Sequence, residues 1–417
     1  MKKLGKYSIG IGDRFGHQGH VQLKAIIEAG KKGVEITPVW NKSNREHLII
    51  GTQPHDVRTE ADMVTSSAGF AKPYFVDADH INLDTVEKFI ESSDFFTVDV
   101  ASYIGKMAGE DEIMQFYLAA EKYTGHFAFP GTNKSLRCSQ DQLMDITDNY
   151  LFAVKKAGEI YRKIESLKGR GNFVTEVSMD EVFQPQTPTE LFFILKMLAE
   201  ESIPVHTFAP KFPGRFNKGV DYSGDPLKFA SEFEADLMVI DYAVREFGLP
   251  ENLKISIHSG SDKFSIYPHI GSIIKKYNKG IHIKTAGTTW LEEVIGLAEA
   301  GGEALAFAKE IYTKSLERIE ELCEPYAGVI DIDTGCLPSA GEVSGWNSRK
   351  FAASLRHIPG NPDYNPNIRQ LIHVGYKLAA QKKEIFSRLL EEHEDVVADS
   401  VFENIYKRHI CRLFGID

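Results

Sequence analysis

Eight short apolar runs, separated by stretches with helical periodicity, constrain the fold of this 417-residue chain more than any other feature. The runs begin near Tyr7, Gly33, Tyr74, Phe95, Phe173, Pro204, Leu253 and Gly280. Buried parallel strands are brief and rich in Val, Ile and Phe, and regular alternation of strand and helix indicates a parallel sheet with right-handed crossovers. Eight such units favour closure into an α/β fold of the (β/α)8 TIM-barrel type. An open, doubly wound sheet is the alternative.

The barrel is expected to form the catalytic domain over residues 1–325, with two additions. A long insertion, at about 101–171, follows the fourth run and contains two helical stretches around a loop with Pro and Gly. Connections of this length usually carry function or a subunit contact. Residues 326–417 are expected to form a loop and helical extension that packs on the barrel, and within it the stretch LRHIPGNPDYNPN is expected to be an ordered lid or an oligomer contact.

The charge balance excludes some classes of partner. The formal net charge is -11, with 48 basic and 59 acidic residues, which argues against nucleic acid or an anionic membrane as the main partner. No stretch approaches the ~18 uninterrupted apolar residues of a membrane span. The four cysteines form no CxxC pair, a pattern typical of a reducing cytoplasm. We therefore expect a cytoplasmic protein that acts on a small molecule and that could form a homo-oligomer.

Four of the apolar runs carry metal-ligand or acid–base residues near their ends. The runs are FVDADH, FVTEV, VHTF and ISIHSG, and the residues are Asp79, His80, Glu176, His206 and His258. Catalytic residues of a barrel sit where its strands end, so we expect these side chains to converge. His80, His206 and His258 are the predicted ligands of a divalent cation (Zn, Mn, Co or Ni), since neutral imidazole binds these metals and a catalytic site typically uses three protein ligands. The alternative is a hydrogen-bonded core role for each of them, and His282, earlier in its run, is a competing ligand that would lie in mid-barrel.

Asp79 and Glu176 are the predicted acid–base pair. Two carboxyl groups in different environments can divide the roles of base and acid. Either of them could instead be a metal ligand. Asp77, which shares the strand face of Asp79, and Asp99, which ends the fourth run, are further candidates.

Basic residues near the strand ends are the predicted substrate-binding groups. Arg14 and His17 follow the first run, Lys211 and Arg215 follow the sixth, and Lys284 ends the eighth. Barrels often bind an anion near their last strands, and a guanidinium can hold a carboxylate through two hydrogen bonds. The alternative is that these are ordinary loop residues, and Lys284 could also form a Schiff base. The opening GIGDRFG does not fit the dinucleotide-binding pattern GxGxxG.

Several motifs resemble the bacterial tagaturonate epimerase family over the whole chain. They are DRFGHQGH at the start, FVDADH ending at His80, VTEVSMDE around Glu176, and NPDYNPNIRQLIHVGYK near the end. The resemblance implies a metal-dependent enzyme that interconverts D-tagaturonate and D-fructuronate in hexuronate catabolism. It also implies that Asp79 is the proton acceptor, Glu176 the proton donor, and His80, His206 and His258 the metal ligands.

The two sugars of that reaction differ at a carbon β to the carbonyl, whose hydrogen is too weakly acidic for simple exchange. A retro-aldol cleavage followed by rotation and re-addition is therefore the expected route, with transient oxidation by a nicotinamide as the rival. A metal-dependent aldolase or aldose–ketose isomerase acting on sugar acids or ketohexoses is the alternative function. A non-catalytic sugar-acid sensor is a further one.

Overall fold

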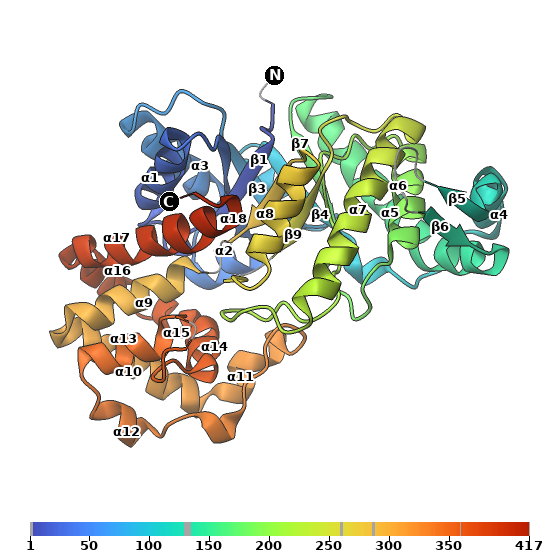
Figure 1. The fold of residues 1–417 in the computed structure, drawn as a ribbon. Coiled ribbons are helices and arrows are strands. Elements are labelled where there is room, and N and C mark those ends of the chain that lie inside the picture. The colour runs from blue at the N-terminus through green and yellow to red at the C-terminus, as the bar shows by residue number, and fades with distance from the viewer. Residues whose placement is uncertain (1–2, 129–134, 259–261, 286–287, 359, 417) are drawn as a thin grey trace.

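Eight parallel strands close into a barrel at the centre of the computed structural model, which describes residues 3–128, 135–258, 262–285, 288–358 and 360–416 (Figure 1). Around the barrel the strands follow the order β1-β10-β9-β8-β7-β4-β3-β2. They are β1 (Tyr7–Ile11), β2 (Ile36–Ser43), β3 (Phe75–Ile81), β4 (Phe95–Asp99), β7 (Val174–Ser178), β8 (Thr207–Ala209), β9 (Lys254–His258) and β10 (Ile281–Lys284). The predicted (β/α)8 barrel is confirmed, and the open sheet is excluded.

Helices surround the barrel and continue beyond its last strand. Those between the strands are α1 (Gly19–Lys31), α2 (Asn44–Ile50), α3 (Pro54–Ser67), α6 (Pro188–Glu200), α7 (Pro226–Phe247) and α8 (Tyr267–Lys276). After β10 come α9 (Thr289–Ala300), α10 (Gly302–Glu317), α11 (Ile319–Cys323), α12 (Ala340–Ser344), α13 (Ser348–Leu355), α14 (Pro366–Val374), α15 (Tyr376–Ala380), α16 (Lys383–Glu392), α17 (Glu394–Phe402) and α18 (Arg412–Phe414). The connection from β3 to β4 departs from the pattern, because it holds a short 3-10 helix, η1 (Val86–Phe89), in place of a full helix.

Local sequence signals determine where several helices begin. Ser43 and Glu46 form a reciprocal capping box at the start of α2, and Thr187 and Glu190 form another at the start of α6. In each box two side chains accept hydrogen bonds from backbone N–H groups that have no partner within the helix. Pro188 begins α6, a position where its missing N–H is not needed.

The insertion after β4 contains a strand pair that the sequence did not predict. It runs through α4 (Glu110–Ala120) to α5 (Gln140–Lys168), and between these helices β5 (Gly125–Ala128) pairs antiparallel with β6 (Ser135–Cys138). This region was expected to be a loop. The pair and α4 lie at the end of the molecule that is farthest from the C-terminal helices (Figure 1).

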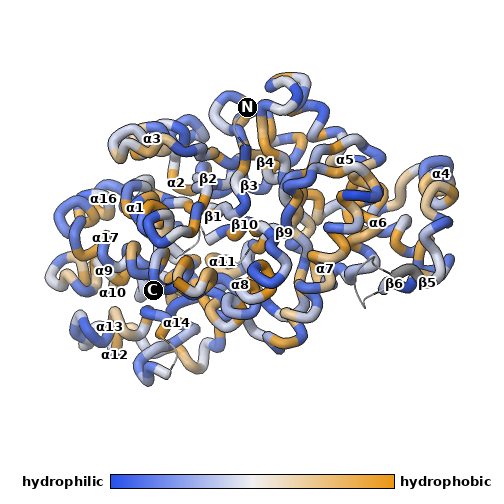
Figure 2. The backbone as a smooth tube through the Cα atoms, turned by 45° about the horizontal axis from the view of Figure 1, so that its top comes forward, coloured by the Kyte–Doolittle hydropathy of each residue, from blue (hydrophilic) through white to orange (hydrophobic). Residues whose placement is uncertain are grey.

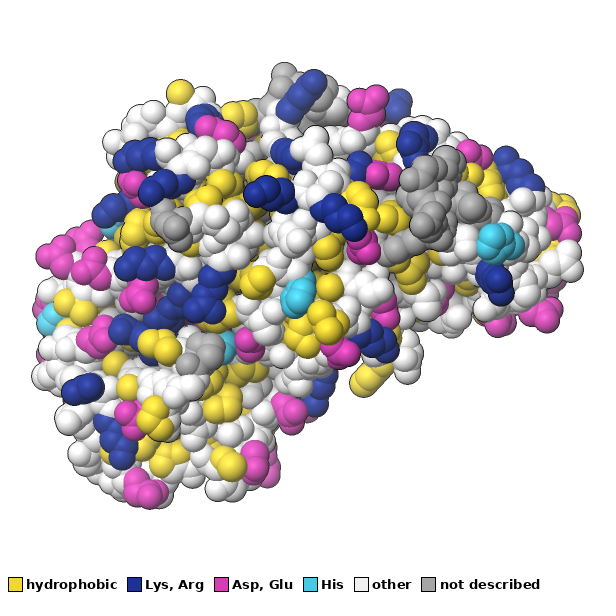
Figure 3. Space-filling view, in the orientation of Figure 1, with side chains coloured by type: hydrophobic (Ala, Val, Ile, Leu, Met, Phe, Trp, Pro, Cys, Tyr) yellow, Lys and Arg dark blue, Asp and Glu magenta, His cyan; other side chains and the backbone are white. Residues whose placement is uncertain are grey.

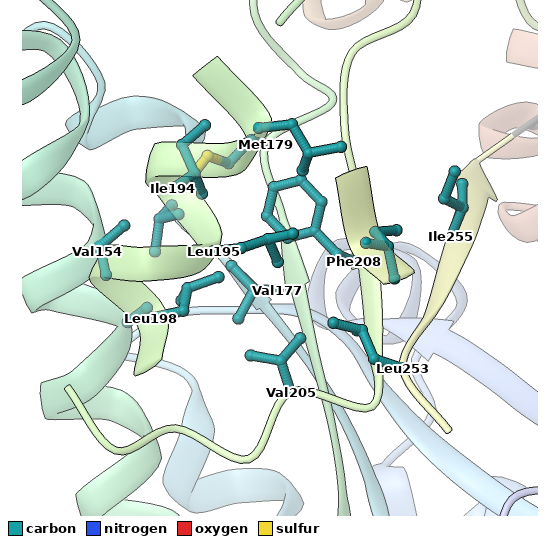
Figure 4. Close-up of a cluster of buried hydrophobic side chains, with 14 of the residues drawn as sticks. Val154, Val177, Met179, Ile194, Leu195, Leu198, Val205, Phe208, Leu253 and Ile255 are labelled. Carbon is teal, nitrogen blue, oxygen red and sulfur yellow. The ribbon is translucent and has the colours of Figure 1, made fainter. Parts of the chain in front are cut away.

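Two large hydrophobic clusters hold the helices on the barrel. In the first, Val177 of β7 and Phe208 of β8 point away from the barrel interior toward Leu195 and Leu198 of α6 (Figure 4). The second joins β1, β2 and α1 to α9, α10 and the helices that follow, and α17 packs against both α9 and α1. The C-terminal helices therefore share a core with the first strands of the barrel.

Helix α1 has one polar face and one apolar face. The tube of α1 contains both hydrophilic and hydrophobic stretches (Figure 2), and its buried residues include Val21, Leu23 and Ile26. On the face drawn in Figure 3, acidic and basic side chains are interspersed with hydrophobic ones. No helix in the described part of the chain is long and apolar enough to cross a membrane.

A half-buried acid on α3 makes stability depend on pH. Burial, and next the charge of Asp13, raise the pKa of Glu60 from 4.5 to about 8. The folded state therefore favours the neutral carboxyl, so its contribution to stability is present below pH 4.5 and is lost as the pH rises toward 8. We expect Glu60→Gln to be more stable than the wild type by about 1–3 kcal/mol at pH 8. Urea unfolding at pH 5 and pH 8 tests this, and an equal difference at the two pH values would contradict it.

Candidate active site

The interior of the barrel changes from apolar to polar toward the carboxyl ends of the strands. Val39, Phe75, Phe95 and Val174 form an apolar layer with Leu4. Alternate side chains of a strand face the same side, so the next interior residues are two positions further on. They are Asn41, Asp77, Thr97 and Glu176, and after them come Asp79, Asp99 and Ser178. The polar layers are therefore stacked at one end of the barrel, the end where barrel enzymes carry their sites.

Lys284 of β10 lies at the centre of the polar layer. Its Nζ is 2.8 Å from Asp77 Oδ2, 2.8 Å from Asp79 Oδ1 and 3.0 Å from Glu176 Oε1. It also donates a hydrogen bond of 2.5 Å to Thr97 Oγ1. Burial alone would lower the pKa of Lys284, but the three carboxylates outweigh it and hold the pKa well above 10.5. An amine kept protonated in this way is a poor nucleophile, which argues against the Schiff-base alternative.

The two aspartates beside Lys284 differ in pKa. Burial raises the pKa of Asp77 to about 7, and its neighbours Asp79 and Glu176 add to the effect of burial. Burial also acts on Asp79, but Lys284 and His80 outweigh it and lower the pKa of Asp79 to about 2. Asp79 is thus a carboxylate at neutral pH.

His80 reaches the barrel mouth because β3 is irregular. In a regular strand it would face the helices, since its neighbour Asp79 faces the interior. However, the register between β3 and β4 shifts between Ala78 and Ile81, and His80 has a left-handed backbone with φ of 51°. An irregularity of this kind can re-aim a side chain. The ring of His80 lies 5.1 Å from the ring of His258, measured between centroids.

His80, Asp180 and His258 could hold a metal ion, since one ligand atom of each lies within 4.8 Å of the others. His258 Nδ1 is buried without a hydrogen-bond partner among the described residues, although it is 3.2 Å from Asp180 Oδ1. The opposite nitrogen, His258 Nε2, is 2.8 Å from Glu176 Oε1, and His80 Nδ1 is 3.2 Å from Asp99 Oδ2. Carboxylates in such positions orient metal-binding imidazoles. The donor set therefore fits a divalent cation.

The electrostatics of this group also favour positive charge. Burial alone would lower the pKa of His80, but Asp79, Asp99 and Asp180 outweigh it and raise the pKa to about 10. In the same way, burial is outweighed at His258, mainly by Asp180, and the pKa rises to about 9. The carboxylates around the two rings therefore attract a cation, whether a proton or a metal ion.

A cavity of about 340 Å³ lies over this group. Its lining comes from several parts of the chain: Arg14, Asn41, Ser43, Asn44, Arg45, Glu46, Asp79, His80, Asn82, Thr85, Asp99, Asp180, Glu181, Lys211, Phe216, Lys218, His258, Lys284, Tyr326 and Val329. The volume suits a small molecule. Tyr326 and Val329 follow the barrel in sequence, so the C-terminal extension contributes to the wall of the cavity.

Of the predicted substrate-binding residues, Arg14, Lys211 and Lys284 line the cavity. Arg14 is already engaged, since its Nε donates a hydrogen bond of 2.8 Å to Glu46 and its guanidinium lies 4.0 Å from the centroid of the Tyr376 ring. Burial lowers the pKa of Lys211, and the nearby charges of Asp180 and Glu181 counteract the shift.

The structure does not bring His17 and Arg215 to the described wall of the cavity. His17 Nε2 lies 3.1 Å from Ser387 Oγ on α16. Arg215 Nη1 forms an ion pair of 2.9 Å with Asp331, and nearly half of the Arg215 side chain, 48%, is exposed. Both follow strand ends, but loops can direct successive side chains either toward the mouth or away from it.

His206 requires a correction, because the structure keeps it apart from His80 and His258. β8 begins at Thr207, so His206 lies at the amino end of the strand instead of its carboxyl end. Thr207 faces the interior and donates a hydrogen bond of 2.7 Å to Glu176, so the preceding side chain faces the opposite side. The Thr175 N–H lies 3.2 Å from His206 Nδ1, and burial, with Lys254, lowers the pKa of His206 to about 4.

His282 also lies away from the mouth. It is fully buried in mid-barrel, with Nδ1 2.9 Å from Ser8 Oγ. Glu176 is fully buried too, and it is not among the described residues that line the cavity. Burial would raise the pKa of Glu176, but Lys284 and His258 outweigh it and hold the pKa well below 4.5. Glu176 is therefore an ionised partner of His258 and Lys284.

Sequence reasoning missed Asp180, although a signal for it was present. Asp180 lies four residues after Glu176, which is an even spacing, so both side chains face the barrel axis. Ser178 Oγ donates a hydrogen bond of 2.5 Å to Asp180 Oδ1 and holds it beside His258. Lys218 and Arg45 were also missed, since Lys218 lies on a loop, where no periodicity indicates direction, and Arg45 lies in the first turn of the short helix α2.

Comparisons with known proteins identify the family and agree with the fold. Residues 1–413 match the model of the family described as UxaE, tagaturonate epimerase. A tagaturonate/fructuronate epimerase of Thermotoga maritima is 28% identical over 424 residues, covering 98% of this chain and 81% of the relative. The native crystal structure of the fructuronate-tagaturonate epimerase UxaE from Cohnella laeviribosi has a TM-score of 0.82 at 25% identity, covering 100% of this chain and 83% of that one. The chain therefore belongs to the tagaturonate epimerase family and is an epimerase, that is, an isomerase enzyme.

Proposed function

We propose that this chain is a divalent-metal-dependent epimerase that interconverts D-tagaturonate and D-fructuronate in the hexuronate catabolism of the cytoplasm. The observation that carries the proposal is the group of His80, Asp180 and His258, which opens onto the same cavity as Asp79 and Lys284. The family match and the names of the two relatives support the ketouronates as substrates.

His80, Asp180 and His258 would hold the cation, while Asp99 and Glu176 orient the two imidazoles through their other nitrogens. Imidazole and carboxylate ligands suit Zn, Mn, Co or Ni. When bound, a divalent cation supplies a Lewis acid that polarises the substrate carbonyl.

Asp79 is the proposed acid–base group of a retro-aldol route. The hydroxyl proton on the carbon β to the carbonyl passes to Asp79 while the bond from that carbon to the α carbon breaks. This leaves an enediolate and an aldehyde. After the aldehyde fragment has rotated, the bond re-forms on its opposite face, and Asp79 returns the proton to the new alkoxide. Lys284, at 2.8 Å, keeps Asp79 ionised between turnovers.

Glu176 is proposed to act by positioning, in place of the proton-donor role expected from the family. It is ionised, fully buried and in contact with His258 Nε2 and Lys284 Nζ at 2.8 Å and 3.0 Å. A carboxylate in this position has no proton to donate, but it fixes the His258 ring and the ammonium group that stabilises Asp79.

Incubation with D-tagaturonate, followed by proton NMR, tests the function. The purified enzyme is expected to form D-fructuronate and to lose this activity after treatment with EDTA. Adding back Mn²⁺, Co²⁺, Ni²⁺ or Zn²⁺ should restore it and identify the metal. Full activity in metal-free enzyme would remove the metal from the proposal, and accumulation of three-carbon products in place of fructuronate would favour the aldolase alternative.

A further inference from the structure

The cations that line the cavity fall into two classes. Lys284 is surrounded by carboxylates, Arg14 is paired with Glu46 at 2.8 Å, and the Arg45 guanidinium lies 4.9 Å from the centroid of the Tyr326 ring. By contrast, among the described residues, neither Lys211 nor Lys218 has an ion-pair or hydrogen-bond partner for its ammonium group. These two half-buried ammonium groups make no direct contact with a carboxylate, so both have donors free to bind an anion that enters the cavity.

The backbone around Lys218 is held by buried contacts on both sides. Lys263 Nζ donates hydrogen bonds of 2.9 Å and 2.6 Å to the carbonyls of Asn217 and Val220. Arg369 of α14 donates one of 2.6 Å to the carbonyl of Gly219. The Lys218 N–H donates to the carbonyl of Val329, at 2.7 Å. The loop therefore presents Lys218 to the cavity from a fixed backbone, and the C-terminal extension supplies two of these contacts.

We propose that Lys211 and Lys218 bind the substrate carboxylate and act as the pivot of the epimerisation. The inference rests on the proposed function and deepens it. In both ketouronates, the carboxylate belongs to the three-carbon aldehyde fragment that retro-aldol cleavage releases, whereas the carbonyl belongs to the other fragment. An anchor on the carboxylate thus holds the fragment that has to turn.

The chemistry requires the fragment to turn without leaving. Bond cleavage transfers the electron pair of the broken C–C bond to the enediolate, and the proton of the hydroxyl goes to Asp79. Re-addition reverses both transfers on the other face of the aldehyde, so atoms and charge balance without a further reactant. A lysine ammonium is a compact charge on a flexible stem with rotatable donors. It can keep contact with the carboxylate while the aldehyde carbon turns, whereas a planar guanidinium would restrict the orientation.

The variant Lys218→Gln tests whether Lys218 holds the substrate carboxylate during the reaction, and Lys228→Gln is the control. Lys228 is an exposed lysine on α7, away from the described wall of the cavity, so its substitution removes the same charge elsewhere. We expect Lys218→Gln to lower kcat/KM for D-tagaturonate by ~10- to 100-fold, as for loss of a hydrogen bond between charged groups. The Ki of neutral D-tagatose as an inhibitor should change by less than about twofold. Thermal unfolding of both variants monitors their folding.

The partition of products is the second readout. When the anchor is weakened, more of the aldehyde fragment should escape before re-addition, so the ratio of three-carbon products to fructuronate should rise in Lys218→Gln and stay unchanged in Lys228→Gln. An equal loss of affinity for tagaturonate and tagatose, or an unchanged product ratio, would overturn the pivot. Failure of the wild-type enzyme to form any fructuronate would instead refute the proposed function.

Discussion

Replacing His258 by alanine is expected to lower kcat by about a thousandfold or more and to remove the bound metal. His258 presents one nitrogen to the group with His80 and Asp180 and is held through the other by Glu176. Its loss removes one of the proposed metal ligands and leaves Glu176 without one of its cationic partners. Metal content by mass spectrometry and turnover of D-tagaturonate measure the two effects. If His258→Ala kept both its metal and its turnover, His258 would not be a metal ligand.

Two further variants decide between the metal ligands predicted from the sequence and the proposed group of His80, Asp180 and His258. Asp180→Asn should lose metal as His258→Ala does, because a neutral amide oxygen is a weaker ligand than a carboxylate. His206→Asn should keep its metal, because His206 lies at the amino end of β8 and contacts the backbone of Thr175. If His206→Asn lost its metal and Asp180→Asn kept it, the ligands predicted from the sequence, His80, His206 and His258, would be the correct ones.

The sequence predicted the barrel well because the signal for it is distributed over many residues. Each strand is a short apolar run. Its outward-facing side chains, such as Val177 of β7 and Phe208 of β8, are buried under the helix layer. A wrong prediction for one strand or helix would therefore still leave the alternation that indicates a barrel. The β5–β6 pair in the insertion and the 3-10 helix η1 were not predicted, because few residues specify each of them.

The site was predicted less completely, since it depends on the direction of single side chains. His258 ends a regular strand, so its position follows from the run that precedes it. His80 was assigned to the mouth, yet alternation would have excluded it, and only the register shift and its left-handed backbone bring it there. His206 was placed at the wrong end of its strand because the short run VHTF does not reveal where pairing begins. Asp180 could have been found by extending the alternation of β7 beyond the strand.

Arg369→Met is the second change with a large expected effect, in this case on stability. Arg369 is fully buried, and its Nη2 lies 2.9 Å from Asp262 Oδ2 and 3.3 Å from Glu292 Oε1. Its other donors bind the carbonyls of Gly219 and Leu355. Removing one partner of a buried ion pair leaves an uncompensated charge, which costs about 3–5 kcal/mol. Urea unfolding of the variant should show a loss of this size.

Arg388→Met is the matched control, because Arg388 forms its ion pairs with Glu392 and Glu303 at the surface. An exposed pair contributes about 0–1 kcal/mol, so this variant should unfold close to the wild type. If Arg369→Met were as stable as Arg388→Met, the buried contacts of α14 would not hold the C-terminal extension on the barrel.

If Arg369→Met is destabilised as expected but still folded at 20 °C, this variant should also bind tagaturonate less tightly, since Arg369 fixes the carbonyl of Gly219 beside Lys218. Stability and substrate affinity would then depend on one arginine that does not touch the substrate.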